Sequence, residues 1–150
     1  GFDSECAFES KYERNMHAID ALVKVAMGLE PVFNFYGTDY DTPDGSSIRD
    51  YVHVSDVASV HINALEYLSN NDDSIITNIG TGKGTSLKEI LHMIEHKIGK
   101  KLNVNHEPRL GVHQPYLVAD MTIARQHLNW DAKYSSLENI IDTKVGKVLK

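Results

Sequence analysis

Short strand-forming runs alternate with amphipathic helical runs along this 150-residue chain, and that alternation limits its fold most strongly. Apolar residues at helical spacing predict helices over 15–28, 55–68, 86–99, 121–128 and 135–148. Strand-like runs are found between them, at 31–37, 51–54, 74–80, 101–107 and 115–120. Strands that alternate with helices predict an α/β protein.

Capping residues sharpen the helix boundaries. Ser55 is expected to cap the second helix, and Ser86 with Glu89 forms a capping-box pattern at the start of the third. Ser135 and Glu138 repeat that pattern before the last helix. The face of the second helix predicted to meet the core carries Val57, Val60, Ala64, Leu65 and Leu68.

Composition excludes several kinds of function. A hydrophobic share of 41% and a charged share of 24% are ordinary for a globular domain with a sizeable core. The net charge of −6 argues against nucleic-acid and membrane partners, although small anions need only a few placed cations. Cys6 stands alone, so no disulfide framework is expected and the cytoplasm is the expected compartment. The opening residues, GFDSECAFESKYER, lack the usual first strand, which indicates a start in the middle of a fold.

The stretch TNIGTGKGTS, residues 77–86, allows two interpretations. Gly80, Gly82 and Gly84 follow a strand-like run and precede a helix, as in a dinucleotide-binding loop, and Glu107 ends the next strand. The spacing G-x-G-x-G differs from the dinucleotide fingerprint, and the chain contains no Gly-Lys-Ser/Thr of a P-loop. We therefore favour a tight strand-to-helix turn over a phosphate cradle.

A more specific pattern covers residues 35–68, FYGTDYDTPDGSSIRDYVHVSDVASVHINALEYL. An aromatic-Gly-x-Asp-Tyr-x-Thr-x-Asp-Gly loop precedes Arg-Asp-Tyr-x-His-Val and a helix that begins near Asp56. NIGTGKGTS at 78–86 and LVADMTIARQHLNW at 117–130 add two further matches. Together these segments closely resemble the C-terminal half of UDP-glucose 4-epimerases, in the extended short-chain dehydrogenase/reductase superfamily. In that family the glycine turn is structural.

The resemblance implies a division of labour. In the family an N-terminal Rossmann lobe binds NAD and a Tyr-x-x-x-Lys pair acts on the sugar 4-hydroxyl, while the hydride leaves and returns at C4. None of the seven tyrosines here is followed by Lys at the fourth place. We therefore expect residues 1–150 to be the substrate-binding lobe alone, with strand 74–80 at the edge of a missing Rossmann sheet. No catalytic residue is expected in this chain, which alone should be inactive.

The same resemblance implies a UDP-sugar site. Arg49 is the expected pyrophosphate ligand, because its planar fork suits phosphate; an ion pair with Asp50 or Asp56 is the alternative. The strand whose backbone meets uracil in the family corresponds to Asn34, Phe35 and Tyr36. The remaining expected contacts are Met16, His17, Arg109, His113 and Leu117.

One loop departs from the family. PRLGVH, residues 108–113, stands where relatives have Pro-Arg-Arg-x-Gly-Asp, so Leu110 replaces a phosphate-binding Arg and His113 replaces the Asp that usually binds ribose. UDP binding is therefore expected to be weakened or rearranged. A stand-alone or degenerate nucleotide-sugar-binding module without catalysis is the alternative function. We also expect self-association or marginal stability through an exposed docking surface around 74–80.

Histidines outside that site do not suggest a metal centre. His53, His61 and His106 have no convincing metal-ligand company in the sequence, and each is interpreted as a surface side chain.

Overall fold

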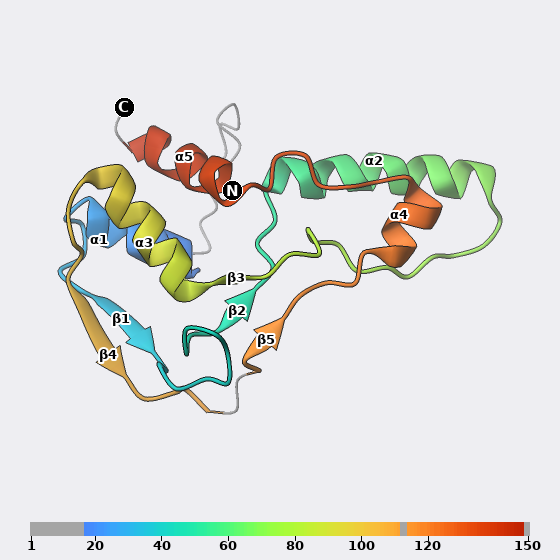
Figure 1. The fold of residues 1–150 in the computed structure, drawn as a ribbon. Helices are drawn as coiled ribbons and strands as arrows, with labels where there is room; N and C mark the ends of the chain where they lie inside the picture. Colours follow the sequence, from blue (N-terminus) through green and yellow to red (C-terminus); the bar gives the residue numbers. More distant parts are fainter. Residues whose placement is uncertain (1–16, 112–113, 149–150) are drawn as a thin grey trace.

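The computed structural model describes residues 17–111 and 114–148. The elements in chain order are α1 (Ala18–Ala26), β1 (Phe33–Tyr36), β2 (Ile48–Arg49), α2 (Val54–Asn70), β3 (Thr85–Ser86), α3 (Leu87–Ile98), β4 (Val104–Glu107), β5 (Tyr116–Leu117), α4 (Thr122–Leu128) and α5 (Leu137–Val148). Helices and short strands are mixed along the chain (Figure 1), so the predicted α/β class is confirmed.

Two small sheets hold the strands. β1 and β4 pair in parallel, from Phe33 opposite Val104 to Tyr36 opposite Glu107. In the second sheet β2 is central, antiparallel to β3 and parallel to β5. The register of β2 places Arg49 opposite Leu117. Each sheet therefore joins segments that lie far apart in the sequence.

The larger hydrophobic cluster lies where α1, β1, α3 and α5 meet, at the left of Figure 1. Its fully buried members are Leu22, Phe35, Ile90, Ile94 and Ile141. Their spacing on α1 and α3 follows the predicted helical stripe. This cluster fixes β1 against α1.

A second cluster joins α2 to α4. Val60, Leu128 and Trp130 are buried in it. The Trp130 indole N–H donates to the Ser59 hydroxyl at 2.7 Å, and the Asn63 amide donates to the Leu128 carbonyl at 2.9 Å. The segment after α4 is thereby tied to α2.

The capping box of α3 is confirmed. The Ser86 hydroxyl accepts from the Glu89 N–H at 3.1 Å, and the Glu89 carboxylate accepts from the Ser86 N–H at 2.7 Å. Gly99 ends the helix with φ +69°, a conformation that a side chain resists. Local sequence alone explains both ends of this helix.

The start of α2 differs from the expectation. Residues 51–53 form no strand, and the strand in this region is β2, at residues 48–49. The cap is His53, whose Nδ1 accepts from the Ser55 N–H at 3.1 Å, so the predicted Ser55 cap is wrong. His53 is also buried, which corrects its interpretation as a surface side chain.

The start of α5 is also capped by a different serine. The Ser135 hydroxyl donates to Asp56 at 2.5 Å and accepts from the His53 N–H at 2.8 Å. Ser136 instead accepts from the Asn139 N–H at 3.2 Å. The predicted Ser135–Glu138 capping box is therefore wrong: a tertiary contact engages Ser135, and the capping hydroxyl is that of the next residue.

The run 74–80 is not the buried strand that its apolar residues predict. Within the described ranges no segment pairs with it, and the Ile76 side chain is 91% exposed. Nearby on α2, Leu65 and Leu68 are 65% and 52% exposed, so their predicted core positions are wrong. Helical spacing identified an apolar stripe, but α2 packs on α4 through Val60, Ala64 and Tyr67 instead.

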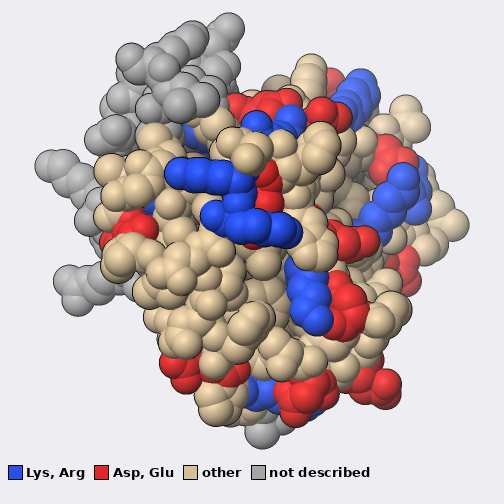
Figure 2. All heavy atoms as spheres, turned by 60° about the vertical axis from the view of Figure 1, so that its left-hand side comes forward, with Lys and Arg blue, Asp and Glu red and all other residues tan. Residues whose placement is uncertain are grey.

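Charged groups are dispersed over the surface. Basic and acidic side chains are interspersed on the face shown in Figure 2. Three ion pairs link α5 to neighbouring helices. Lys97 of α3 pairs with Glu138 and, at 2.7 Å, with Asp142. Lys144 pairs with Asp20 of α1. Among helices of the described ranges, none has the length and apolar character needed to cross a bilayer.

Asp44 fastens the loop after β1 to the start of α3. Its carboxylate accepts from the Ser46 N–H at 2.8 Å and hydroxyl at 2.7 Å, and from the Ser86 hydroxyl. Desolvation raises the pKa of this carboxyl, but the hydrogen bonds and the charge of Lys88 outweigh it and hold the pKa below its ordinary 3.8.

A depressed folded-state pKa makes this contribution sensitive to acid. Stabilisation by Asp44 is present above the unfolded-state value and lost as the pH falls through the lowered folded-state value. We expect wild type to exceed Asp44→Asn in unfolding free energy at about pH 7, with the difference shrinking as the pH falls below 3.8. Urea denaturation of both proteins at each pH measures this difference in unfolding free energy. A difference that stays constant with pH would contradict the prediction.

Candidate functional site

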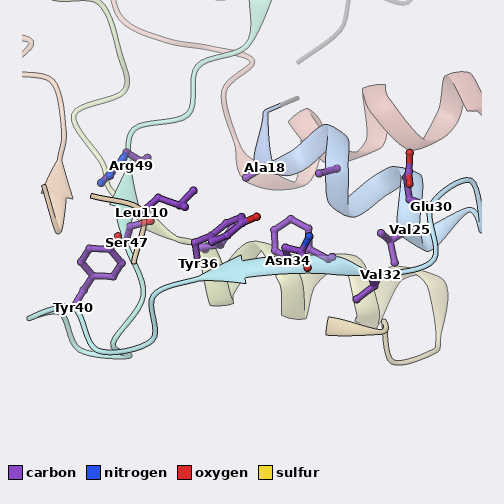
Figure 3. A pocket seen from close by; sticks show the side chains of 13 residues that line it. Ala18, Val25, Glu30, Val32, Asn34, Tyr36, Tyr40, Ser47, Arg49 and Leu110 are labelled. Carbon is purple, nitrogen blue, oxygen red and sulfur yellow. The ribbon is translucent and has the colours of Figure 1, made fainter. Parts of the chain in front are cut away.

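A cavity of about 530 Å³ lies between α1, β1 and the segments that carry Ser47 and Leu110. Figure 3 shows Arg49 and Leu110 at one end, Tyr36 and Asn34 along β1, and Glu30 at the other end. The lining residues are Ala18, Ala21, Val25, Glu30, Val32, Phe33, Asn34, Tyr36, Tyr40, Ser47, Arg49, Leu87 and Leu110. Such a volume falls within the range of about 300–1,000 Å³ for small-molecule sites.

β1 builds one wall by simple alternation. Phe33 and Phe35 are buried, whereas Asn34 and Tyr36 are exposed, because successive strand residues point to opposite faces. Asn34 and Tyr36 therefore border the cavity. Phe35 is fully buried in the core, so only its backbone is left to contact a ligand.

Arg49 reaches the cavity from β2. Its Nη1 donates to the Ile48 carbonyl at 2.7 Å, and no ion pair among the described residues includes it. Asp50 and Asp56, the alternative partners, are bonded elsewhere. A guanidinium without a carboxylate partner at a cavity wall is suited to an anionic ligand.

The same strand leads to Tyr51. Burial raises the pKa of the Tyr51 hydroxyl above its ordinary 10.0, against an opposing effect of the positive charge of Arg49. Tyr51 therefore stays protonated at neutral pH.

The glycine turn is structural. The Asp50 carboxyl oxygens accept from the Thr81 N–H at 2.9 Å, the Thr81 hydroxyl at 2.6 Å and the Gly82 N–H at 3.0 Å. A side chain at Gly80 would meet Asp50, since an added Cβ would lie 2.4 Å from its Oδ2. The amides that would hold a phosphate are therefore already occupied from within the chain.

Arg109 is not among the residues that line the cavity. Its Nε lies 2.7 Å from Asp39 Oδ1, and its Cζ lies 4.4 Å from the centroid of the Tyr40 ring. Nη2 donates to the Asp39 carbonyl. Arg109 thus fixes Tyr40, which lines the cavity, while the next residue, Leu110, lines the cavity itself and is 53% exposed.

Leu110→Arg should add a second guanidinium to the end of the cavity that holds Arg49. A charge-assisted hydrogen bond contributes about 1.5–3 kcal/mol, so we expect the UDP that the resemblance implies to bind roughly ten to a hundred times more tightly. Titration calorimetry measures it, with Leu68→Arg on α2 as a control for added charge. An unchanged dissociation constant in Leu110→Arg would contradict the prediction.

Two further predicted contacts, His17 and Leu117, belong to the described residues and do not line this cavity. His17 precedes α1 and is exposed, with no capping hydrogen bond from its side chain. Leu117 is exposed on β5 opposite Arg49 and is not among the described residues that line the cavity. Met16 and His113 lie outside the described residues.

Sequence reasoning missed the α1 wall and the residues Glu30, Tyr40 and Ser47. Ala18, Ala21 and Val25 repeat at helical spacing on α1; Val25 is a buried member of the larger cluster and both alanines pack against it, so this face meets the core and also lines the cavity. That small-residue face was the available signal. The contributions of Tyr40 and Ser47 depend on the loop between β1 and β2, which has no periodicity.

The histidines have structural partners. His53 Nε2 lies 3.2 Å from the Thr143 hydroxyl, and the His61 ring bonds the Val57 carbonyl at 2.7 Å. The His106 ring lies 5.5 Å from that of Phe35. In the described part of the chain, no group of three or more potential ligands could hold a metal ion.

Comparison with known proteins identifies the family of this chain. The model of the NAD dependent epimerase/dehydratase family matches residues 6–80. UDP-glucose 4-epimerase of Rhizobium meliloti is 39% identical over 134 residues, which are 89% of this chain and 41% of that protein.

Solved structures match over nearly the whole chain. The complex of Brucella ovis UDP-glucose 4-epimerase with NAD has a TM-score of 0.89 and 36% identity, over 98% of this chain and 45% of that one. The Stenotrophomonas maltophila enzyme, with bound NAD and formylated UDP-arabinopyranose, has a TM-score of 0.84 and 33% identity, over 92% of this chain and 41% of that one. The chain thus spans about two-fifths of the length of these relatives. With half of its residues matched by the family model, this chain belongs to the NAD dependent epimerase/dehydratase family.

Proposed function

We propose that this chain supplies the UDP-sugar-binding part of a UDP-glucose 4-epimerase, which interconverts UDP-glucose and UDP-galactose with NAD. The observation that carries the proposal is Arg49, a guanidinium without a carboxylate partner in the described ranges, at one end of a cavity of about 530 Å³. Arg49 would bind the pyrophosphate, and the β1 wall of Asn34 and Tyr36 would hold the nucleoside. The relatives' names support this assignment.

NAD does not fit the described residues of this chain. The glycine turn is the sequence's nearest approach to a dinucleotide loop, and Asp50 occupies its amides. We therefore assign NAD binding, and the hydride transfer at sugar C4, to the part of the family's length that this sequence does not span. We propose that the chain alone is inactive.

Titration of the chain with UDP tests the proposal. We expect saturable binding that weakens at least about tenfold in Arg49→Ala, since a charge-assisted hydrogen bond is lost. Arg125→Ala is the matched control, because Arg125 pairs with Asp131 and does not line the cavity. Absence of UDP binding, or equal loss in both variants, would contradict the proposal.

A second candidate is a nucleotide-sugar-binding module without catalysis. The observation in its favour is Leu110, which gives the cavity an apolar side chain where relatives would place a phosphate ligand. UDP binding by the chain, without epimerase activity when it is supplied with the family's cofactor-binding part, would favour this candidate.

A further inference from the structure

We propose that Asn34, held by Asn105 and Glu107, selects a pyrimidine with a carbonyl at position 4 over one with an amino group there. The inference rests on the proposed function, because it takes the cavity to hold the base of a nucleoside diphosphate. It assigns base selection to a side-chain relay on β1 and β4, in addition to any contact made by the strand backbone.

The relay consists of three side chains. Asn105 stands directly opposite Asn34 in the parallel pair. Its Nδ2 donates to the Glu107 carboxylate at 2.7 Å and to Asn34 Oδ1 at 3.3 Å. Of the three, only Asn34 lines the cavity, so Asn105 and Glu107 are positioning residues.

The relay determines which end of the Asn34 amide is available to a ligand. A carboxylate only accepts hydrogen bonds, so Glu107 requires the nitrogen of Asn105 on its side. The same nitrogen also donates to Asn34 Oδ1 at 3.3 Å, which holds the Asn34 oxygen toward Asn105. The Asn34 NH₂ group is then left toward the cavity, and in Figure 3 its nitrogen lies on the α1 side of β1.

The position of Asn34 along β1 places this donor at the far edge of the base. Arg49 marks the phosphate end of the cavity, and Tyr36 lies nearer to it than Asn34 does. Asn34 and Tyr36 are two residues apart on β1, which corresponds to roughly 7 Å. A base with its ribose toward Tyr36 would present its distal edge to Asn34. Uracil has a carbonyl acceptor at position 4, whereas cytosine has an amino donor that would face the donor of Asn34.

The experiment compares the dissociation constants of UDP and CDP by calorimetry. We expect wild type to bind UDP about tenfold more tightly than CDP, which corresponds to about 1.4 kcal/mol. Asn34→Asp replaces the donor by an acceptor and should lower the CDP-to-UDP ratio of dissociation constants at least about tenfold. The added negative charge weakens both diphosphates alike, so the ratio isolates the contact with the base.

Two further variants separate positioning from general damage. Asn105→Ala frees the Asn34 amide to turn, so the ratio should move toward one while UDP still binds. Asn103→Ala is the matched control, because the Asn103 amide donates to the Pro31 carbonyl and takes no part in the relay.

The outcomes distinguish the two proposals. A wild-type chain that binds no UDP overturns the proposed function, and this inference with it. UDP binding with a ratio that Asn34→Asp does not change overturns the inference alone. UDP binding with a lowered ratio in Asn34→Asp and Asn105→Ala, and not in Asn103→Ala, supports both.

Discussion

Asp56→Ala is expected to lower the free energy of unfolding by at least about 3 kcal/mol. The Asp56 side chain is 1% exposed and sits in the first turn of α2. Its carboxyl oxygens accept from the Lys133 N–H at 2.9 Å, the Tyr134 N–H at 2.8 Å and the Ser135 hydroxyl at 2.5 Å. Alanine leaves all three donors without this acceptor, and each lost hydrogen bond to a charged group costs about 1.5–3 kcal/mol.

Urea denaturation followed by circular dichroism measures this loss. Asp56→Asn keeps one acceptor oxygen and should lie between wild type and Asp56→Ala. Asp72→Ala is the control, because Asp72 is exposed and has no recorded partner among the described residues, so its change should stay within about 0.5 kcal/mol. Equal stability of Asp56→Ala and Asp72→Ala would show that Asp56 does not hold α2 to the segment before α5.

Asp50→Asn should lower the free energy of unfolding by about 2–3 kcal/mol and should also weaken UDP binding. The asparagine NH₂ would replace an acceptor in a site that receives Thr81, Gly82 and Ala119 N–H groups, so at least one donor would face another donor. Because Arg49 is the neighbouring residue, displacement of this junction moves the proposed phosphate ligand as well.

Denaturation and UDP titration on the same protein check both effects. Asp41→Asn in the loop after β1 provides the comparison, since Asp41 is exposed and has no recorded bond among the described residues. A stable Asp50→Asn protein with unchanged UDP affinity would show that the junction does not position Arg49.

Features specified by neighbouring residues could be predicted from sequence. α1, β1 and α3 occur where their periodicity placed them, and Ser86, Glu89 and Gly99 bound α3 as expected. The structural role of the glycine turn was also anticipated, through resemblance and irregular spacing. The Asp50 carboxyl that fills it was not, because that contact spans 31 residues.

Features set by distant partners could not be predicted. Ser135 looked like a helix cap, but it bonds Asp56, 79 residues away. Leu65 looked like a core residue, because periodicity identifies an apolar face without stating what covers it. Likewise, Arg109 matched a phosphate-binding motif, yet its guanidinium is engaged by Asp39 and Tyr40. The cavity combines both kinds of information: its β1 wall follows from alternation, and its other walls depend on tertiary contacts.

The carboxyl group in the glycine turn can also be understood as a tethered competitor. Asp50 belongs to the same chain as the amides it bonds, so its effective concentration there is set by the fold and does not depend on the solution. Free phosphate or a dinucleotide would have to displace a ligand that never diffuses away. Sequence changes at the glycines alone therefore cannot turn this loop into a nucleotide site while Asp50 remains.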